Sequence, residues 1–332
     1  MAFIVNGADW YFDGMSAEEV EALIDHALAF VEVSVDRGEK VWIGDDFQTR
    51  PMYGGRSIWD LFADNSPIRL PGEISQELAG WLSKAHYYAD VDEWPDGAED
   101  VFISIGETTP VDNADVAWVH HCIRASIPAA SFTLGATALS DTTTAAGVAT
   151  LHFVGDEIGR RRFWRDVIVL EGDGLESLVR NSPHAYPALL FADGVLRHVD
   201  RLSGGYPASR QRVQTALAAL DDWGHWVFTW PPPAISPQEG PPLDADARPG
   251  NLLIQNRFAG VGLTAAPENP DVWKDRVSRE ARQTILAART LYCEWHVKLE
   301  PHRNRIHFHR PIPESGDKVV IGMIDEHLPL PT

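Results

Sequence analysis

The chain has 332 residues, of which 44% are hydrophobic and 23% are charged, and its net charge is −20. This composition is that of a globular protein. The excess of acidic residues argues against non-specific binding of nucleic acid by the whole surface, because a polyanion would be repelled. We expect no membrane segment and no secretory signal, since no apolar run approaches about 20 residues and the N-terminus lacks a basic region. The chain has only two cysteines, which argues against a disulfide framework and favours the cytoplasm.

Residues 1–100 have the pattern of an α/β subregion. Ser16 and Glu19 have the spacing of a capping box, and the apolar residues that follow recur at helical spacing up to about Gly38. A short strand is predicted at 41–43 and a second helix at 73–87. These elements indicate a scaffold and carry no catalytic motif.

Residues 101–230 alternate between strand and helix patterns, which predicts an α/β domain with a mostly parallel sheet. Strands are expected at 101–105, 129–134 and 148–154, and helices at 114–124, 157–167 and 208–220. Their order in the sheet cannot be predicted from this pattern. Gly-rich phosphate-binding loops are absent, so no nucleotide cofactor is indicated.

Residues 231–250 contain seven prolines and no periodicity, which predicts a semi-rigid linker. The remaining residues, 251–332, are expected to form a separate α+β domain. Its predicted order is a strand at 252–260, a helix at 272–290, and an antiparallel meander with strands near 292–299, 304–310 and 318–324.

Residues 293–310 alternate twice between polar and apolar side chains across a short turn, which predicts a β-hairpin with two chemically opposite faces. The expected core face comprises Cys293, Trp295, Val297, Leu299, Asn304, Ile306 and Phe308. The opposite face comprises Glu294, His296, Lys298, Arg303, Arg305, His307 and His309. A solvated strand face rarely gathers this many imidazoles and cations, and residues 255–310 hold 10 Lys and Arg against 6 Asp and Glu. The polar face is therefore the candidate site.

This set of side chains suits chemistry on a phosphate. Cleavage of RNA through the 2′-hydroxyl needs a general acid, a general base and cations to stabilise the charge that develops on phosphorus. Histidine titrates near neutral pH, and arginine binds phosphate in a bidentate way. The candidate catalytic residues are His296, Lys298, Arg303, Arg305, His307 and His309. The candidate phosphate-binding residues are Arg303 and Arg305, with Arg279 and Arg282 from the predicted helix.

Two other interpretations of the polar face stay open. Glu294, His296, His307 and His309 have the ligand types of a cupin-like metal-dependent enzyme. The neighbouring cations would repel a divalent ion, however, so we assign no metal and no cofactor. Alternatively, the N-terminal region covers this face and pairs its charges, which would make the face structural.

The C-terminal residues resemble the RelE/ParE-like fold of bacterial toxins. The resemblance depends on the segments 294–299 (EWHVKL), 303–308 (RNRIHF) and 318–324 (KVVIGMI), and it covers about 80 residues. Many members of that family are ribosome-dependent endoribonucleases, so the resemblance implies a toxin-like or defence effector that binds or cleaves RNA, with RNA or the ribosome as partner. A different class of function is a non-catalytic interaction component of a bacterial defence complex, whose acidic N-terminal region binds a protein partner.

Overall fold

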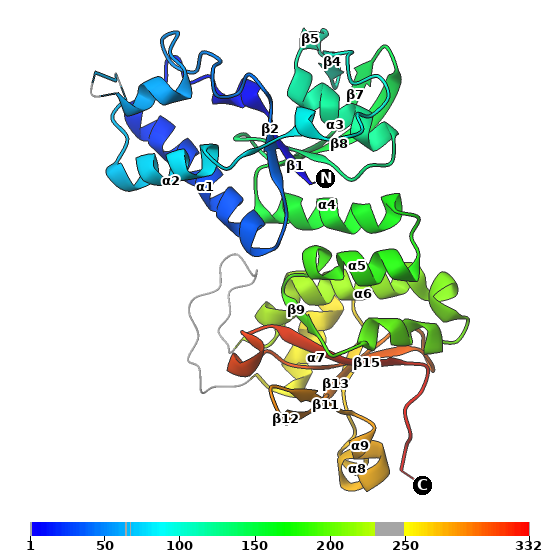
Figure 1. Ribbon diagram of the computed structural model, residues 1–332. Coiled ribbons are helices and arrows are strands. Elements are labelled where there is room, and N and C mark those ends of the chain that lie inside the picture. The colour runs from blue at the N-terminus through cyan, green and yellow to red at the C-terminus, as the bar shows by residue number, and fades with distance from the viewer. Residues whose placement is uncertain (1, 64, 67, 230–248, 332) are drawn as a thin grey trace. The chain divides into compact units, whose positions relative to one another are not determined.

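The computed structural model describes residues 2–63, 65–66, 68–229 and 249–331. The chain divides into two compact units, Met1–Leu170 and Glu171–Thr332. Figure 1 shows both units as mixtures of helices and strands, so the predicted α/β class is confirmed.

The first unit is built on an eight-stranded sheet in the order β3-β2-β1-β6-β8-β7-β4-β5. The strands from β3 to β8 are parallel to their neighbours, and the last three are antiparallel, which confirms the mostly parallel sheet. The strands are β1 (Phe3–Val5), β2 (Val41–Ile43), β3 (His86–Tyr87), β4 (Phe102–Ile105), β5 (Val111–Asp112), β6 (Ala130–Phe132), β7 (Ala138–Thr144) and β8 (Gly147–Val154).

Helices cover both faces of the parallel part of this sheet, as buried parallel strands require. They are α1 (Ala17–Asp36), α2 (Gly72–Leu82), α3 (Ala114–Arg124) and α4 (Glu157–Leu170), with short 3-10 helices η1 (Gly7–Trp10), η2 (Ile58–Phe62) and η3 (Tyr88–Asp90). From β1, Phe3 contacts Phe30 of α1 and Phe163 of α4, whereas Ile4 belongs to the buried cluster around α3. The capping box of Ser16 and Glu19 begins α1 as predicted.

The second unit contains a five-stranded sheet in the order β10-β13-β14-β15-β9. Only the pair of β9 and β15 is parallel. The strands are β9 (Leu189–Phe191), β10 (Ala265–Pro267), β13 (Trp295–Lys298), β14 (Arg305–His309) and β15 (Val319–Asp325), and a separate hairpin is formed by β11 (Gln283–Leu286) and β12 (Arg289–Tyr292). The helices are α5 (Leu175–Ala185), α6 (Gly205–Val227), α7 (Asn251–Gly260), α8 (Pro270–Lys274) and α9 (Arg276–Glu280), with η4 (Val195–Arg201) and η6 (Pro313–Ser315).

The predicted domain boundaries differ from the division in the structure. One sheet joins residues on both sides of residue 100, because β1 pairs with β6. Most of the predicted linker, residues 231–248, lies outside the described residues. The elements before and after it belong to one unit, since β9 pairs with β15. Gly224 of α6 also packs against β15, because a Cβ added at Gly224 would lie 2.6 Å from Cγ2 of Val319. The boundary between the units is instead at residues 170 and 171.

Two elements predicted after the linker are wrong. The expected strand at 252–260 is the helix α7, whose Ile254, Arg257 and Phe258 are buried at helical spacing. The expected helix at 272–290 is two short helices followed by the β11–β12 hairpin. Asp275 ends α8 and caps α9, and Ala287 and Ala288 adopt φ values of 47° and 65° at the tight turn. The turn lacks the Gly or Asn that usually indicates such a conformation. The antiparallel meander of β13, β14 and β15 is confirmed.

We expect residues 171–332 to fold alone and residues 251–332 to remain unfolded. The shorter fragment lacks β9 and α6, which would expose the face of β15 that packs on α6. Circular dichroism during heating should show one cooperative transition for 171–332 and none for 251–332. A cooperative transition for the shorter fragment would support the linker as a domain boundary.

Candidate functional site

The apolar face of the β13–β14 hairpin lies against α6 and α7, as the alternation predicts. Trp295 and Phe308 contact Phe258 of α7, with ring centroids 6.1 and 5.7 Å apart, and both also contact Phe228. All predicted core residues of the hairpin are buried except Leu299, which is half-buried. This aromatic packing fixes which way the polar face points.

The polar face is only partly open to solvent. His296 and His307 stand opposite each other in the register and are 8% and 0% exposed, whereas Lys298 and Arg305 form the next pair and are half-buried. Glu294 and His309 are also half-buried, and Arg303 is exposed. The six residues predicted to be catalytic therefore do not form one accessible site.

Arg282, which directly precedes β11 of the same unit, lies beside the buried part of this face through its ion pair with Glu268. Gly322 of β15 approaches β11 and Cys293, a predicted core residue, since a Cβ at Gly322 would lie 2.2 Å from Cys293 Sγ and 3.3 Å from Thr284 Cγ2. Arg282 is 1% exposed, and its Nη1 donates to the carbonyl oxygens of Ser278 (2.8 Å) and Pro329 (2.9 Å). Arg282 is thus a structural cation rather than the predicted phosphate ligand.

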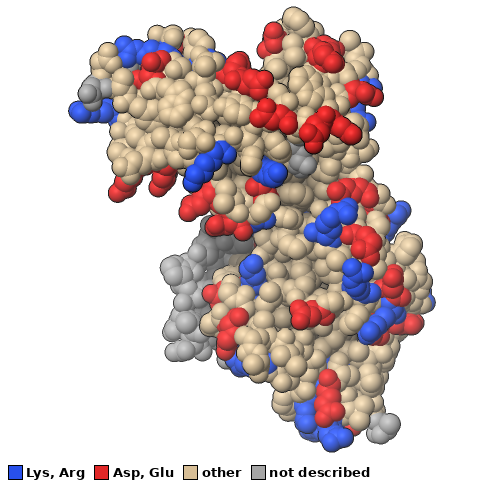
Figure 2. Space-filling view, in the orientation of Figure 1, with Lys and Arg blue, Asp and Glu red and all other residues tan. Residues whose placement is uncertain are grey.

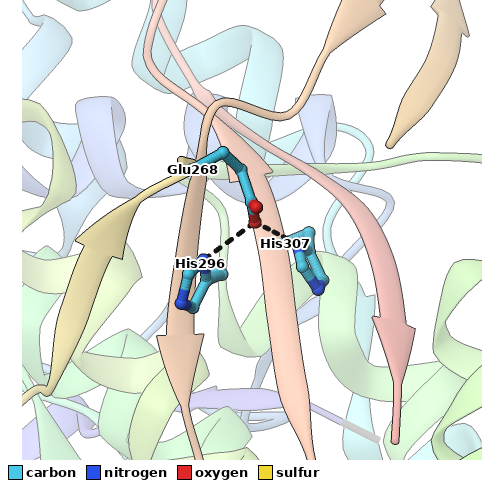
Figure 3. A group of neighbouring side chains, drawn as sticks. All are labelled: Glu268, His296 and His307. Atoms are coloured by element: carbon cyan, nitrogen blue, oxygen red, sulfur yellow. Dashed lines mark hydrogen bonds and ion pairs between the residues drawn. The ribbon is translucent and has the colours of Figure 1, made fainter. Parts of the chain in front are cut away.

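A buried carboxylate, Glu268, brings the covering residues and the histidines together (Figure 3). Glu268 directly follows β10, and its amide donates to the carbonyl of Glu294, 2.8 Å away. Its Oε1 lies 2.8 Å from Nδ1 of His296 and 3.0 Å from Nδ1 of His307, and its Oε2 lies 2.9 Å from Nε of Arg282. We call these four residues the Glu268 cluster: Glu268, Arg282, His296 and His307.

Glu268 is not among the site residues that the sequence predicts. It lies 28 residues before His296 in a segment, Pro267-Glu268-Asn269-Pro270, that has no strand or helix periodicity. Only the pairing of β10 with β13 places it beside the hairpin. The proline on each side is a turn signal, but it does not indicate which strand the turn approaches.

Burial and the neighbouring charges set the protonation of the Glu268 cluster. Burial by itself would raise the pKa of Glu268, but His296 and His307 outweigh it and lower that pKa well below its usual range. Burial lowers the pKa of His307 to about 4, although Glu268 opposes this shift. At neutral pH the cluster therefore holds a carboxylate paired with Arg282, beside a neutral His307. A buried neutral imidazole of this kind is poorly placed to act as a general acid on a substrate.

The other predicted residues occupy separate places. Nε of Arg303 lies 2.7 Å from Oε2 of Glu300. Nδ1 of His309 donates to the carbonyl of Arg310 at 2.7 Å, and burial lowers the pKa of His309. The guanidinium of Arg279 lies 5.5 Å from the ring centre of Trp273 in α8, which is 51% exposed.

The predicted metal set does not assemble as a group. Glu294 lies 3.5 Å from Nε of Arg310, and His309 is held by the backbone. Of the four predicted ligands, only His296 and His307 lie side by side, and Glu268 occupies the position expected for Glu294. Within the described residues, this set of Glu268, His296 and His307 is the group whose ligand atoms all lie within 4.8 Å of one another.

Comparison with known proteins found no match to this chain among family models, curated proteins or solved structures. The resemblance to the RelE/ParE-like fold stays a prediction. In the parts of the chain that the structure describes, no helix combines the length and apolar character needed to cross a membrane.

We expect acid to destabilise the protein partly through His307. The pKa of His307 is about 4 in the folded protein and 6.5 in the unfolded chain. Its contribution to the free energy of unfolding is therefore complete above pH 6.5 and is lost as the pH falls towards 4. The full loss is about 3 kcal/mol. Glu268, whose folded pKa is also lowered, acts in the same direction at lower pH. Urea unfolding at several pH values should give a flatter profile for His307→Phe than for the wild type. Parallel profiles would show that His307 is protonated equally in both states.

We expect Arg282→Met to lower the free energy of unfolding by about 3 kcal/mol, because it leaves the Glu268 carboxylate buried without its cation. Adding Glu268→Gln should recover part of this loss in the double variant. The control is Lys274→Met in the exposed pair with Asp271, where the loss should stay below about 1 kcal/mol. Equal losses for Arg282 and Lys274 would contradict the ion pair's role.

Proposed function

We propose that the C-terminal unit binds RNA through Lys298 and Arg305. The observation that carries this proposal is their pairing in the register between β13 and β14. Like charges directly opposite on one sheet face destabilise it. Neither cation forms an ion pair within 4.0 Å among the described residues, although Asp325 stands opposite Arg305 on β15. A phosphate group held between the two cations would relieve this repulsion.

Two further features support RNA over other anions. The exposed Trp273 with Arg279 beside it offers a ring on which an unpaired base can stack, and base stacking on aromatic residues is typical of single-stranded RNA recognition. On the face drawn in Figure 2, Asp and Glu gather over the first unit, whereas Lys and Arg lie among them over the second. The positive segment 255–310 belongs to the second unit.

The proposal is for binding rather than cleavage. A general acid or base has to come within hydrogen-bonding reach of the substrate. His296 and His307 instead face Glu268 and are 8% and 0% exposed, so they do not supply these groups. In a toxin-like or defence effector, RNA binding of this kind would bring the protein to a transcript or a ribosome. The cytoplasm is part of this proposal, and both cysteines are buried, in keeping with it.

Fluorescence anisotropy of a labelled single-stranded RNA tests the proposal on the full chain. The variant is Lys298→Ala/Arg305→Ala. The matched control is Arg197→Ala/Arg210→Ala, which removes equal charge from the same unit at exposed positions already paired with Glu176 and Asp173. We expect the first variant to bind roughly tenfold more weakly, with a salt dependence reduced by about two phosphate contacts. The control should bind like the wild type.

Two results would contradict RNA binding at this site. One is the absence of binding by the wild type at micromolar protein and low salt. The other is an equal loss in both double variants, which would mean that only the net charge matters. Single-stranded DNA of the same sequence shows whether the 2′-hydroxyl contributes to the affinity.

A further inference from the structure

We propose that Glu268, His296 and His307 bind a divalent transition-metal ion such as Zn²⁺. These residues come from three segments of the chain, namely the end of β10, β13 and β14. Two imidazoles with one carboxylate are ligands that suit Zn²⁺, Fe²⁺ or Mn²⁺. The proposal concerns the buried end of the sheet face and does not depend on RNA binding at Lys298 and Arg305.

The spacing of the three side chains fits a shared ion. Metal–ligand distances of about 2.0–2.2 Å place neighbouring ligand atoms about 3 Å apart. Oε1 of Glu268 lies 2.8 Å from Nδ1 of His296 and 3.0 Å from Nδ1 of His307. Figure 3 shows the carboxylate between the two rings, so one ion beside Oε1 would reach both nitrogens with small movements of the side chains.

An unsatisfied buried imidazole gives a second, independent reason. His307 is 0% exposed, and neither of its ring nitrogens has a hydrogen bond of normal geometry in the described part of the chain. Its Nδ1 is close to the Glu268 carboxylate but poorly aligned with it. Buried polar atoms without partners are rare and often indicate a bound ion or water. A metal ion bound to Nδ1 would satisfy this nitrogen.

Arg282 determines how Glu268 would bind the ion. Nε of Arg282 lies 2.9 Å from Oε2 of Glu268 and pairs with this oxygen. Oε1 is then the oxygen that binds the metal, so Glu268 would be a monodentate ligand. The contact at Oε2 is an ion pair, since Arg282 Nε makes no hydrogen bond of normal geometry among the described residues. Partners outside the ligand shell commonly orient a metal-binding carboxylate in this way. The positive charge of Arg282 also opposes the ion, so we expect weaker binding than in cysteine-rich zinc sites.

The bound ion would join β10, β13 and β14 and stabilise the folded protein. Binding to the folded state alone raises the free energy of unfolding in proportion to the logarithm of the ion concentration above the dissociation constant. The effect should be lost when a chelator is added. This readout needs no knowledge of the protein's activity.

The experiment uses the full chain without a polyhistidine tag, stripped with EDTA and then exchanged into chelator-free buffer. We would measure Zn²⁺ bound per chain by mass spectrometry, the visible absorption after adding Co²⁺, and the melting temperature with and without Zn²⁺. The variants are His307→Phe and Glu268→Gln. The matched control is His309→Phe, a histidine on the same strand that lies outside the cluster.

We expect about one tightly held Zn²⁺ per chain in the wild type and the control, and less than about a fifth of that in the two variants. Zn²⁺ should raise the melting temperature of the wild type and the control only. If His307→Phe fails to fold, Glu268→Gln and the Co²⁺ spectrum of the wild type still decide the matter. The proposal is overturned if the wild type binds no Zn²⁺, or if the folded variants bind as much as the control, since the ion would then lie elsewhere.

Discussion

The second unit depends on the burial of one carboxylate, Glu268, beneath the polar face of its sheet. A charge taken out of water is costly unless it is paired and hydrogen-bonded. Arg282 supplies the opposite charge to Oε2, and His296 donates to Oε1. Arg282 in turn ties this arrangement to the carbonyls of Ser278 and Pro329. The Glu268 carboxylate therefore holds together the segments that carry Arg282, His296, Ser278 and Pro329.

The opposite face of the same hairpin supplies the hydrophobic part of the fold. Trp295 and Phe308 pack with Phe228, which directly follows α6, and with Phe258 of α7. Burial of such rings contributes several kcal/mol. Since side chains alternate along a strand, this packing forces His296 and His307 to the other side. The two faces are thus linked, and the two histidines on the polar side face the Glu268 carboxylate, which is paired with Arg282.

The sequence predicted what depends on local periodicity. The capping box of Ser16, the alternation in 293–310 and the parallel strands of the first unit all produce a signal within a few residues. The sequence did not predict what depends on contacts between distant segments. Glu268 reaches the hairpin only through the pairing of β10, and β9 joins β15 across more than a hundred residues. The turn at Ala287 and Ala288 also lacks the residues that usually indicate a turn, and for this reason the sequence predicts a helix across it.

The same distinction between local periodicity and distant contacts explains why only part of the candidate site could be predicted. Alternation correctly placed His296, Lys298, Arg305 and His307 on one face, and the register then separated them into a buried pair and a half-buried pair. Burial cannot be inferred from the hairpin alone, because it depends on Arg282 and on the segments that cover the sheet. This separation assigns the two pairs different roles, with anion binding proposed for Lys298 and Arg305 and metal binding proposed for the histidines with Glu268.

The most direct test of this account is the protonation of His307 itself. A pH titration of its ring nitrogens by NMR in the metal-free protein, with His307→Phe to assign the signals, measures its pKa in the folded state. The account predicts that His307 stays neutral until the pH falls to about 4, as burial against Glu268 requires. A His307 that titrates near 6.5 while the protein stays folded would show that this face is open to solvent, and the buried cluster would be contradicted.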